Sequence, residues 1–305
     1  MAVPPGAGAI VMGTGIVSVA LEHDGHEALS RIVLALAAAL WLLLAAAVIG
    51  RAVGDRAGLL GDARTPAALT GSAATAVLGT RLTLLGWTWA GIAALCIAAL
   101  LWAALLEPVL GALERPAVGV ELLVAVAPEA LAVLAATVAE AERAAWLLVV
   151  ALAPFALGLL CYAYVIARFD ARQLAVGRGD HWIAGGAVAI AALAAGLLTS
   201  GTATLGVWPG AHAPLRDVAL VLWATAMLWL VALLVAEARW PRPAYDPHRW
   251  STVFPLGMYA VCSFAVGAAA HAGGVTDFAR VWVWVAFAVW AVVLVGTVRH
   301  ARQDR

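Results

Sequence analysis

Long stretches of this chain contain no charged residue, among them 32–50, 84–105 and 145–167. An α-helix of roughly 20 apolar residues is long enough to cross the hydrocarbon of a bilayer. The rest of the chain is similar, because 65% of its 305 residues are hydrophobic and only 12% are charged. Soluble domains are about 45–50% apolar and about 25% charged. The chain is therefore predicted to be an all-α integral membrane protein, and a cytosolic enzyme, a disordered chain and a secreted disulfide scaffold are excluded.

Ten stretches are predicted to be transmembrane helices. They are 7–21, 32–50, 66–82, 84–105, 118–138, 145–167, 182–201, 217–237, 250–271 and 280–298. The connections between them are short, so we expect residues 1–305 to form a single ten-helix transmembrane domain without a soluble domain. The first stretch lacks a basic flank and a cleavage site, and we expect it to be retained as a span.

The arginines orient the chain in the membrane. All eighteen basic residues are Arg; thirteen lie in the tail after 298 or in connections that follow even-numbered stretches, and five lie on the other side. Cytoplasmic loops carry such an excess. We expect a multi-pass protein of the plasma (inner) membrane with both termini in the cytoplasm. The net charge of zero provides no basic field for nucleic acid.

Small and bulky residues separate the ten stretches into two sets. The odd-numbered stretches hold twelve Gly and twelve Ser or Thr, whereas the even-numbered stretches hold five Gly and three Ser or Thr. Trp shows the opposite distribution, with two in the odd-numbered and ten in the even-numbered stretches. Small residues let helices approach closely, and Trp is suited to the membrane interface. This predicts five helical hairpins, with the odd helices forming an inner ring around a central pore and the even helices outside.

Several polar residues of the inner set are candidates for the pore. Thr14, Ser18, Ser72 and Thr75 could line it, although small residues could instead serve only to tighten a protein core. Pro128 and Pro255 each remove a backbone hydrogen bond and are predicted to kink their helices. In hydrocarbon, the freed carbonyl is tolerated only where protein or a water-filled cavity surrounds it.

Glu129 follows Pro128 near the middle of the fifth stretch. A charged acid at that depth costs a few kcal/mol on insertion scales (about 2.5–3.5). It is therefore either a proton-linked or pore-lining acid or a neutral packing residue, with Arg81 as a possible partner unless that side chain reaches the interface.

Signals for other chemistry are weak. His23 and His26 have an H-x-x-H spacing, but a surrounding acidic loop explains them better than a metal site does. Gly13-Thr14-Gly15 follows no strand and so is not a dinucleotide loop. The three cysteines lie in apolar runs without C-x-x-C spacing. We expect no metal, no cofactor and no enzymatic activity.

Three motifs resemble one known family. They are Val11-Met12-Gly13-Thr14-Gly15-Ile16, Gly179-Asp180-His181-Trp182-Ile183 with Gly185-Gly186, and Trp250-Ser251-Thr252-Val253-Phe254-Pro255-Leu256-Gly257-Met258-Tyr259-Ala260. The chain resembles the tellurite-resistance/dicarboxylate transporter family, which includes plant guard-cell slow anion channels and yeast malate and sulfite transporters. The likeness extends over nearly the whole chain.

The resemblance implies a homotrimer with a pore through each subunit, gated by a phenylalanine of the ninth helix, here Phe254. Expected partners are the lipid bilayer and small anions: chloride-like ions, dicarboxylates such as malate, or oxyanions such as sulfite and tellurite. Alternatives are a proton-coupled dicarboxylate carrier that uses Glu129, a membrane-embedded enzyme that uses Glu129 and a histidine, and a structural scaffold.

The predicted orientation can be tested by labelling single cysteines in a background without Cys96, Cys161 and Cys262. We expect residues in 22–31 and 202–216 to be labelled from outside the cell. Labelling of a residue in 169–178 from the periplasm would contradict the orientation.

Overall fold

The computed structural model describes residues 5–303, which are helical apart from turns, loops and one isolated bridge between Ala117 and Phe169. The long helices are α1 (Gly8–His23), α2 (Glu27–Gly54), α4 (Thr70–Leu84), α5 (Thr88–Leu110), α6 (Leu123–Ala141), α7 (Ala145–Ile166), α9 (Ile183–Thr204), α10 (His212–Arg239), α11 (Trp250–Ala269) and α12 (Gly273–Gln303). Helices α3 (Arg56–Asp62) and α8 (Gln173–Val176) and five 3-10 turns lie between them, and one further 3-10 turn precedes α1.

Eight of these helices in the described chain are long and apolar enough to cross a membrane. The prediction of an all-helical integral membrane protein is confirmed to that extent. The other two, α1 and α4, have 16 and 15 residues. Part of the stretch predicted at 66–82 is instead the 3-10 turn η2 (Pro66–Leu69), because Pro66 lacks a backbone N–H and suits the first turn of a helical segment.

Five tight turns join the long helices into antiparallel hairpins. In each turn a residue with positive φ follows the first helix, and the N–H of the next residue bonds back to a carbonyl five positions earlier. These residues are Gly25, Gly86, Arg143, Gly206 and His271, and the α9–α10 turn has a second positive φ at Trp208. This left-handed ending satisfies carbonyls that the last helical turn leaves free. The pairs are α1–α2, α4–α5, α6–α7, α9–α10 and α11–α12.

The first helix of every hairpin is buried, and the second is exposed. The most apolar segments of α6, α9 and α11 are 100%, 89% and 83% buried, against 17–22% in α2, α5, α7, α10 and α12. Most residues of α1 and α4 are also buried. We call α1, α4, α6, α9 and α11 the inner helices and the other five the outer helices.

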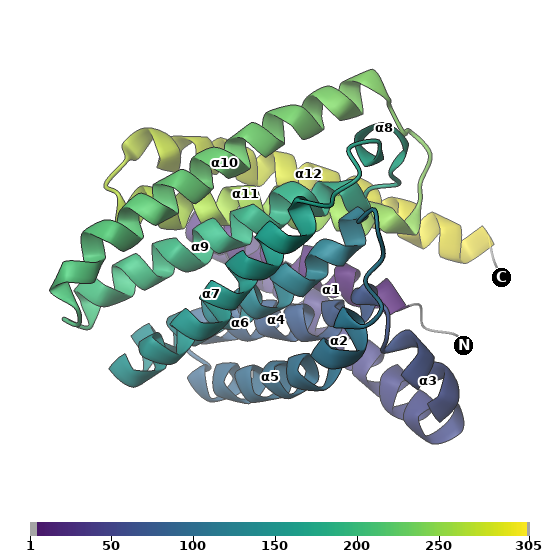
Figure 1. The fold of residues 1–305 in the computed structure, drawn as a ribbon, viewed down its shortest axis with the longest axis horizontal. Helices are drawn as coiled ribbons and strands as arrows, with labels where there is room; N and C mark the ends of the chain where they lie inside the picture. Colours follow the sequence, from purple (N-terminus) through teal and green to yellow (C-terminus); the bar gives the residue numbers. More distant parts are fainter. Residues whose placement is uncertain (1–4, 304–305) are drawn as a thin grey trace.

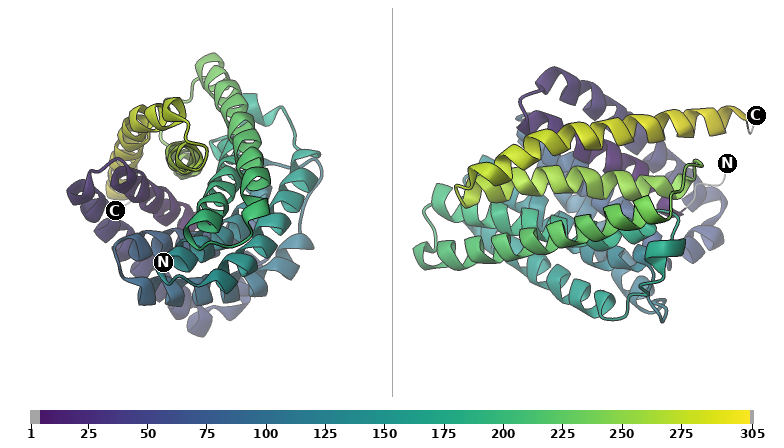
Figure 2. Two further views of the ribbon diagram at one scale, coloured as in Figure 1. Left: turned by 90° about the vertical axis from the view of Figure 1, so that its left-hand side faces the viewer. Right: turned by 90° about the horizontal axis from the view of Figure 1, so that it is seen from above.

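Contacts among the inner helices close into a ring, in which α1 contacts α4, α4 contacts α6, α6 contacts α9, α9 contacts α11, and α11 contacts α1. Figure 2 shows the bundle along its length and from above. The start of α1, helix α8 and the end of α12 lie at the same end of the bundle, which we call the α8 end (Figure 1). Arg305, which the orientation count includes, lies outside the described residues, as do residues 1–4.

An ion pair between a buried arginine and a partly exposed glutamate joins α4 to α2. The Arg81 side chain is fully buried; its Nε donates to Ser30 Oγ at 2.9 Å, and its Nη2 lies 2.6 Å from Glu27 Oε2. Glu27 also contacts Arg31, which is exposed. Arg81 therefore has its acidic partner in α2 and not in Glu129.

We expect Glu27→Gln to lower stability by about 1–3 kcal/mol, because it leaves the buried Arg81 guanidinium without its counter-charge. The control Arg31→Gln breaks an exposed pair of the same acid and should cost about 0–1 kcal/mol. Thermal unfolding of both purified variants measures the difference. Equal melting temperatures would show that the Arg81 pair contributes no more than the exposed one.

Candidate functional site

A polar loop fixes the beginning of α11, the helix that carries the longest of the three motifs. The Asp246 carboxylate accepts a hydrogen bond from the His248 backbone N–H at 2.9 Å and lies 2.7 Å from His248 Nδ1. Burial raises the pKa of the Asp246 carboxyl, but the hydrogen bonds to His248 lower it by more. The pKa therefore lies below its usual value. The 3-10 turn η6 (Pro247–Arg249) then leads directly into α11.

One side of α11 lies against α1 with almost no space between the two backbones. A Cβ added to Gly13 would be 3.1 Å from Val253 Cγ1, and one added to Gly257 would be 2.5 Å from Ile16 Cγ2. Real Cβ atoms rarely approach other atoms this closely, so glycine is required for the contact. Val253 and Gly257 thus mark the side of α11 that faces α1.

Two further sides of α11 are also occupied. Pro255 lies against α9, where a Cβ on Gly186 would be 2.7 Å from Pro255 Cγ. Thr252 and Leu256 line a groove bordered by the outer helices α10 and α12. Successive residues of an α-helix are about 100° apart, so the Phe254 side chain points about 200° around the helix from Thr252 and from Leu256. Phe254 therefore points to the side opposite the groove, which is the interior of the inner ring.

Apolar side chains fill this interior beside Phe254. Phe254 is 3% exposed, and the fully buried Met258 follows it by one turn on the same side. Met12 of α1 is also buried. Thr14 lies two residues after it and bonds to the outer helix α12. Because residues two apart point to nearly opposite sides of a helix, Met12 points away from α12. The ring is closed by packed side chains at this level.

The four candidate pore hydroxyls all bond to outer helices. The pairs are Trp290 Nε1 with Thr14 Oγ1 at 3.2 Å, Ser18 Oγ with the Ser30 carbonyl at 2.8 Å, Ser72 Oγ with the Ala98 carbonyl at 2.8 Å, and Trp41 Nε1 with Thr75 Oγ1 at 2.9 Å. Hydrogen bonds between membrane helices contribute about 0.6 kcal/mol each on average. These hydroxyls thus attach the outer helices to the ring, and the structure does not bring them together with Phe254.

Glu129 is placed between α6 and α7. It is 1% exposed, and its carboxylate oxygens have no hydrogen-bond partner among the described residues. A Cβ on Gly158 of α7 would be 2.5 Å from Glu129 Oε1. The acid therefore lies on the side of α6 that faces an outer helix. Helix α6 continues through the neighbouring Pro128, as α11 does through Pro255.

The two histidines of the first turn have acidic neighbours. His23 Nδ1 lies 3.0 Å from Glu22, and His26 Nε2 lies 3.3 Å from Asp24. Within residues 5–303, no group of three or more His, Cys, Asp or Glu side chains is placed so that it could hold a metal ion.

Comparison with protein families decides where the chain belongs. A family model described as voltage-dependent anion channel matches residues 2–298. The chain belongs to the voltage-dependent anion channel family. The match includes all three motifs, so the resemblance inferred from them is confirmed, and the chain is a multi-pass membrane protein.

Curated relatives match a shorter part of the chain than the family model does. The chain is similar to an uncharacterized membrane protein of Mycobacterium tuberculosis, found in strains CDC 1551 / Oshkosh and ATCC 25618 / H37Rv. The sequences are 34% identical in an alignment of 132 residues that covers 39% of this chain. The chain spans 63% of the length of these relatives.

The position of Glu129 gives a test of its role. We expect Glu129→Gln to leave anion flux and its pH dependence unchanged, because the side chain lies between two helices and glutamine has the same shape. Flux into liposomes over a pH series measures this, with Glu142→Gln in the exposed α6–α7 turn as the control. Loss of the pH dependence in folded Glu129→Gln alone would contradict a packing role.

Proposed function

We propose that the protein is a channel or transporter for small anions in the plasma membrane, with a path through the inner ring of each subunit. Membership of the voltage-dependent anion channel family over residues 2–298 is the observation that carries this proposal. The proposed substrates are chloride-like ions, dicarboxylates such as malate, and oxyanions such as sulfite or tellurite. The anion crosses unchanged, so no catalytic residue, cofactor or metal is assigned.

In this proposal all ten long helices cross the membrane as one domain, both termini are cytoplasmic, and three copies form a homotrimer. The repeated hairpin turns support the layout, because each of the five hairpins joins a buried helix to an exposed one. The shortness of α1 and α4 fits it as well. Their beginnings are continued by the 3-10 turns η1 (Pro5–Ala7) and η2, and an inner helix does not need to match the hydrocarbon thickness where protein surrounds it.

Phe254 is the proposed gate of this path. The other sides of α11 face α1, α9 and the groove, so the Phe254 ring lies on the side that faces the interior of the inner ring. A hydrophobic constriction blocks ions by excluding water. An anion that loses its hydration beside a phenyl ring receives no hydrogen bond in exchange, and this creates a barrier of several kcal/mol.

We expect Phe254→Ala to raise anion flux about tenfold or more, since each 1.4 kcal/mol removed from a barrier gives about a factor of ten. Single-channel or liposome-flux recordings measure the change. Phe254→Leu removes less volume and should give a smaller increase, which also provides a test if the alanine variant does not fold. Unchanged or reduced flux in both folded variants would contradict the gate.

Phe264 of the same helix supplies the control. It is partly buried, and its ring lies 5.9 Å from that of His23 at the end of α1. Phe264→Ala should therefore lower the melting temperature without raising the flux. An increase equal to that of Phe254→Ala would mean that loosening α11 anywhere opens the path.

A proton-coupled dicarboxylate carrier is the second candidate function. The observation in its favour is the Glu129 carboxyl, which is buried and has no hydrogen-bond partner among the described residues. A carrier of this kind would couple each anion to protons, whereas a channel passes current without a pH gradient. Flux and current recorded with and without such a gradient separate the two functions.

A further inference from the structure

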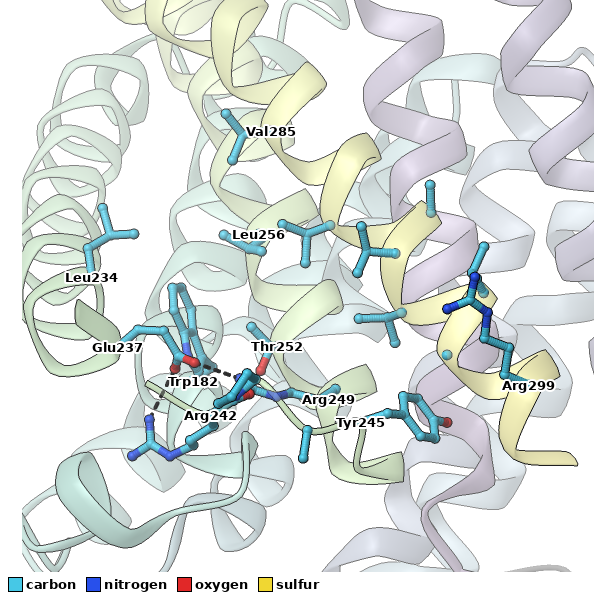
Figure 3. Close-up of a pocket in the computed structure, with 18 of the residues that line it drawn as sticks. Trp182, Leu234, Glu237, Arg242, Tyr245, Arg249, Thr252, Leu256, Val285 and Arg299 are labelled. Atoms are coloured by element: carbon cyan, nitrogen blue, oxygen red, sulfur yellow. Dashed lines mark hydrogen bonds and ion pairs between the residues drawn. The ribbon is translucent and has the colours of Figure 1, made fainter. Parts of the chain in front are cut away.

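A groove of about 800 Å³ opens on the outside of the ring, between α10 and α12 and over α11. Its walls are apolar and include Leu234 of α10, Leu256 of α11 and Val285 of α12 (Figure 3). Val292 of α12 lines it as well. Leu234, Val285 and Val292 are also exposed on the outer surface. The groove is therefore open on the outer surface of the helix bundle and offers hydrocarbon-like surface to whatever enters it from the side.

One end of the groove is strongly basic. Glu237 lies 3.1 Å from Arg242 Nη1 and 2.8 Å from Arg249 Nη1. Figure 3 shows these three side chains together, with Arg299 farther along the same end. Among the residues that line the groove, three guanidinium groups and one carboxylate leave two positive charges in excess. Arg242 also donates to the Leu174 carbonyl of α8 at 2.8 Å, so this basic end lies at the α8 end of the bundle.

Two buried polar groups at the basic end have no partner in the described chain. Thr252 is 6% exposed and Trp182 is 2% exposed, and neither Thr252 Oγ1 nor Trp182 Nε1 has a hydrogen-bond partner there. Both residues line the groove beside Glu237 and the arginines (Figure 3). Buried donors are almost always paired in proteins, so this end is suited to a ligand with acceptor oxygens.

We propose that the groove binds an anionic phospholipid. The phosphate accepts hydrogen bonds from Arg242 and Arg249, Arg299 of α12 adds positive charge farther along the groove, and ester or phosphate oxygens reach Thr252 and Trp182. An acyl chain lies along the apolar walls. Basic pockets between transmembrane helices on the cytoplasmic side bind anionic head groups in this way, and arginine forks match phosphate oxygens.

Charge and shape together select this occupant. A free phosphate would use the arginines but leave the valine and leucine walls uncovered, and a zwitterionic lipid would not neutralise the two excess positive charges. The orientation that the Arg count predicts has the α8 end in the cytoplasm, where the inner leaflet carries anionic lipids, so this step rests on the proposed function. The bound lipid touches Thr252 and Leu256, which flank Phe254 on the opposite side of the same helical turn.

Native mass spectrometry of the delipidated protein tests the proposal. It is titrated with phosphatidylglycerol and, separately, with phosphatidylcholine of the same acyl chains. We expect phosphatidylglycerol to bind the wild type at about tenfold lower concentration, and Arg242→Gln/Arg299→Gln to lose most of that preference, since each arginine near a head group contributes about fivefold. The double variant Arg56→Gln/Arg172→Gln removes two exposed charges from the same end, outside the groove, and should keep the preference.

Further variants separate the other occupants. Arg299→Gln leaves the Glu237 pairs intact and should lose part of the preference even if the double variant does not fold. Val289→Trp places a larger side chain in the apolar wall and narrows the groove, so it should weaken binding of both lipids. Equal binding of the two lipids to wild type would overturn the proposal, as would a groove variant that behaves like its control. Thermal stabilisation by inorganic phosphate equal to that by phosphatidylglycerol would assign the basic end to a free anion.

Discussion

The structure depends on how closely the inner helices approach one another. Gly13 and Gly257 bring α1 and α11 together, and Gly186 lets the Pro255 ring fit against α9. Lipid tails are as apolar as leucine, so the hydrophobic effect does not drive membrane helices together. What remains is dispersion and hydrogen bonding, and both require short distances. The glycines provide those distances, and the ring would be wider and looser with larger residues at these positions.

Once α11 is held against α1 and α9, its remaining sides have fixed directions. Thr252 and Leu256 take the side toward the groove, and Phe254 takes the side toward the axis. Alternation within one helical turn thus gives α11 two different faces. One is closed by apolar side chains packed inside the ring. The other lines an open groove with arginines at one end, so the proposed gate and the proposed lipid site would share the same two turns of helix.

Composition predicted which helices lie inside, because a helix surrounded by protein can use Gly, Ser and Thr, whereas one that faces lipid needs large apolar residues. Gly25, Gly86 and Gly206 also carry the local signal for the hairpin turns. Composition does not determine the direction of a side chain around its helix. Thr14 and Ser72 belong to inner helices as predicted, yet their hydroxyls are used in bonds to α12 and α5. That direction depends on the partner helix, which a single sequence does not specify.

The same reasoning explains Glu129 and the groove. From the sequence, Glu129 stood out because an acid in the middle of a span is costly, but its side of α6 is set by Gly158 on α7. Arg242 and Arg249 were informative only as charges that orient the chain. Folding places them around Glu237, next to a Thr and a Trp from two of the three family motifs. Residues of one motif therefore serve different surfaces: Phe254 faces the axis while Thr252 faces the groove, so similarity along the motif does not assign one role to all its members.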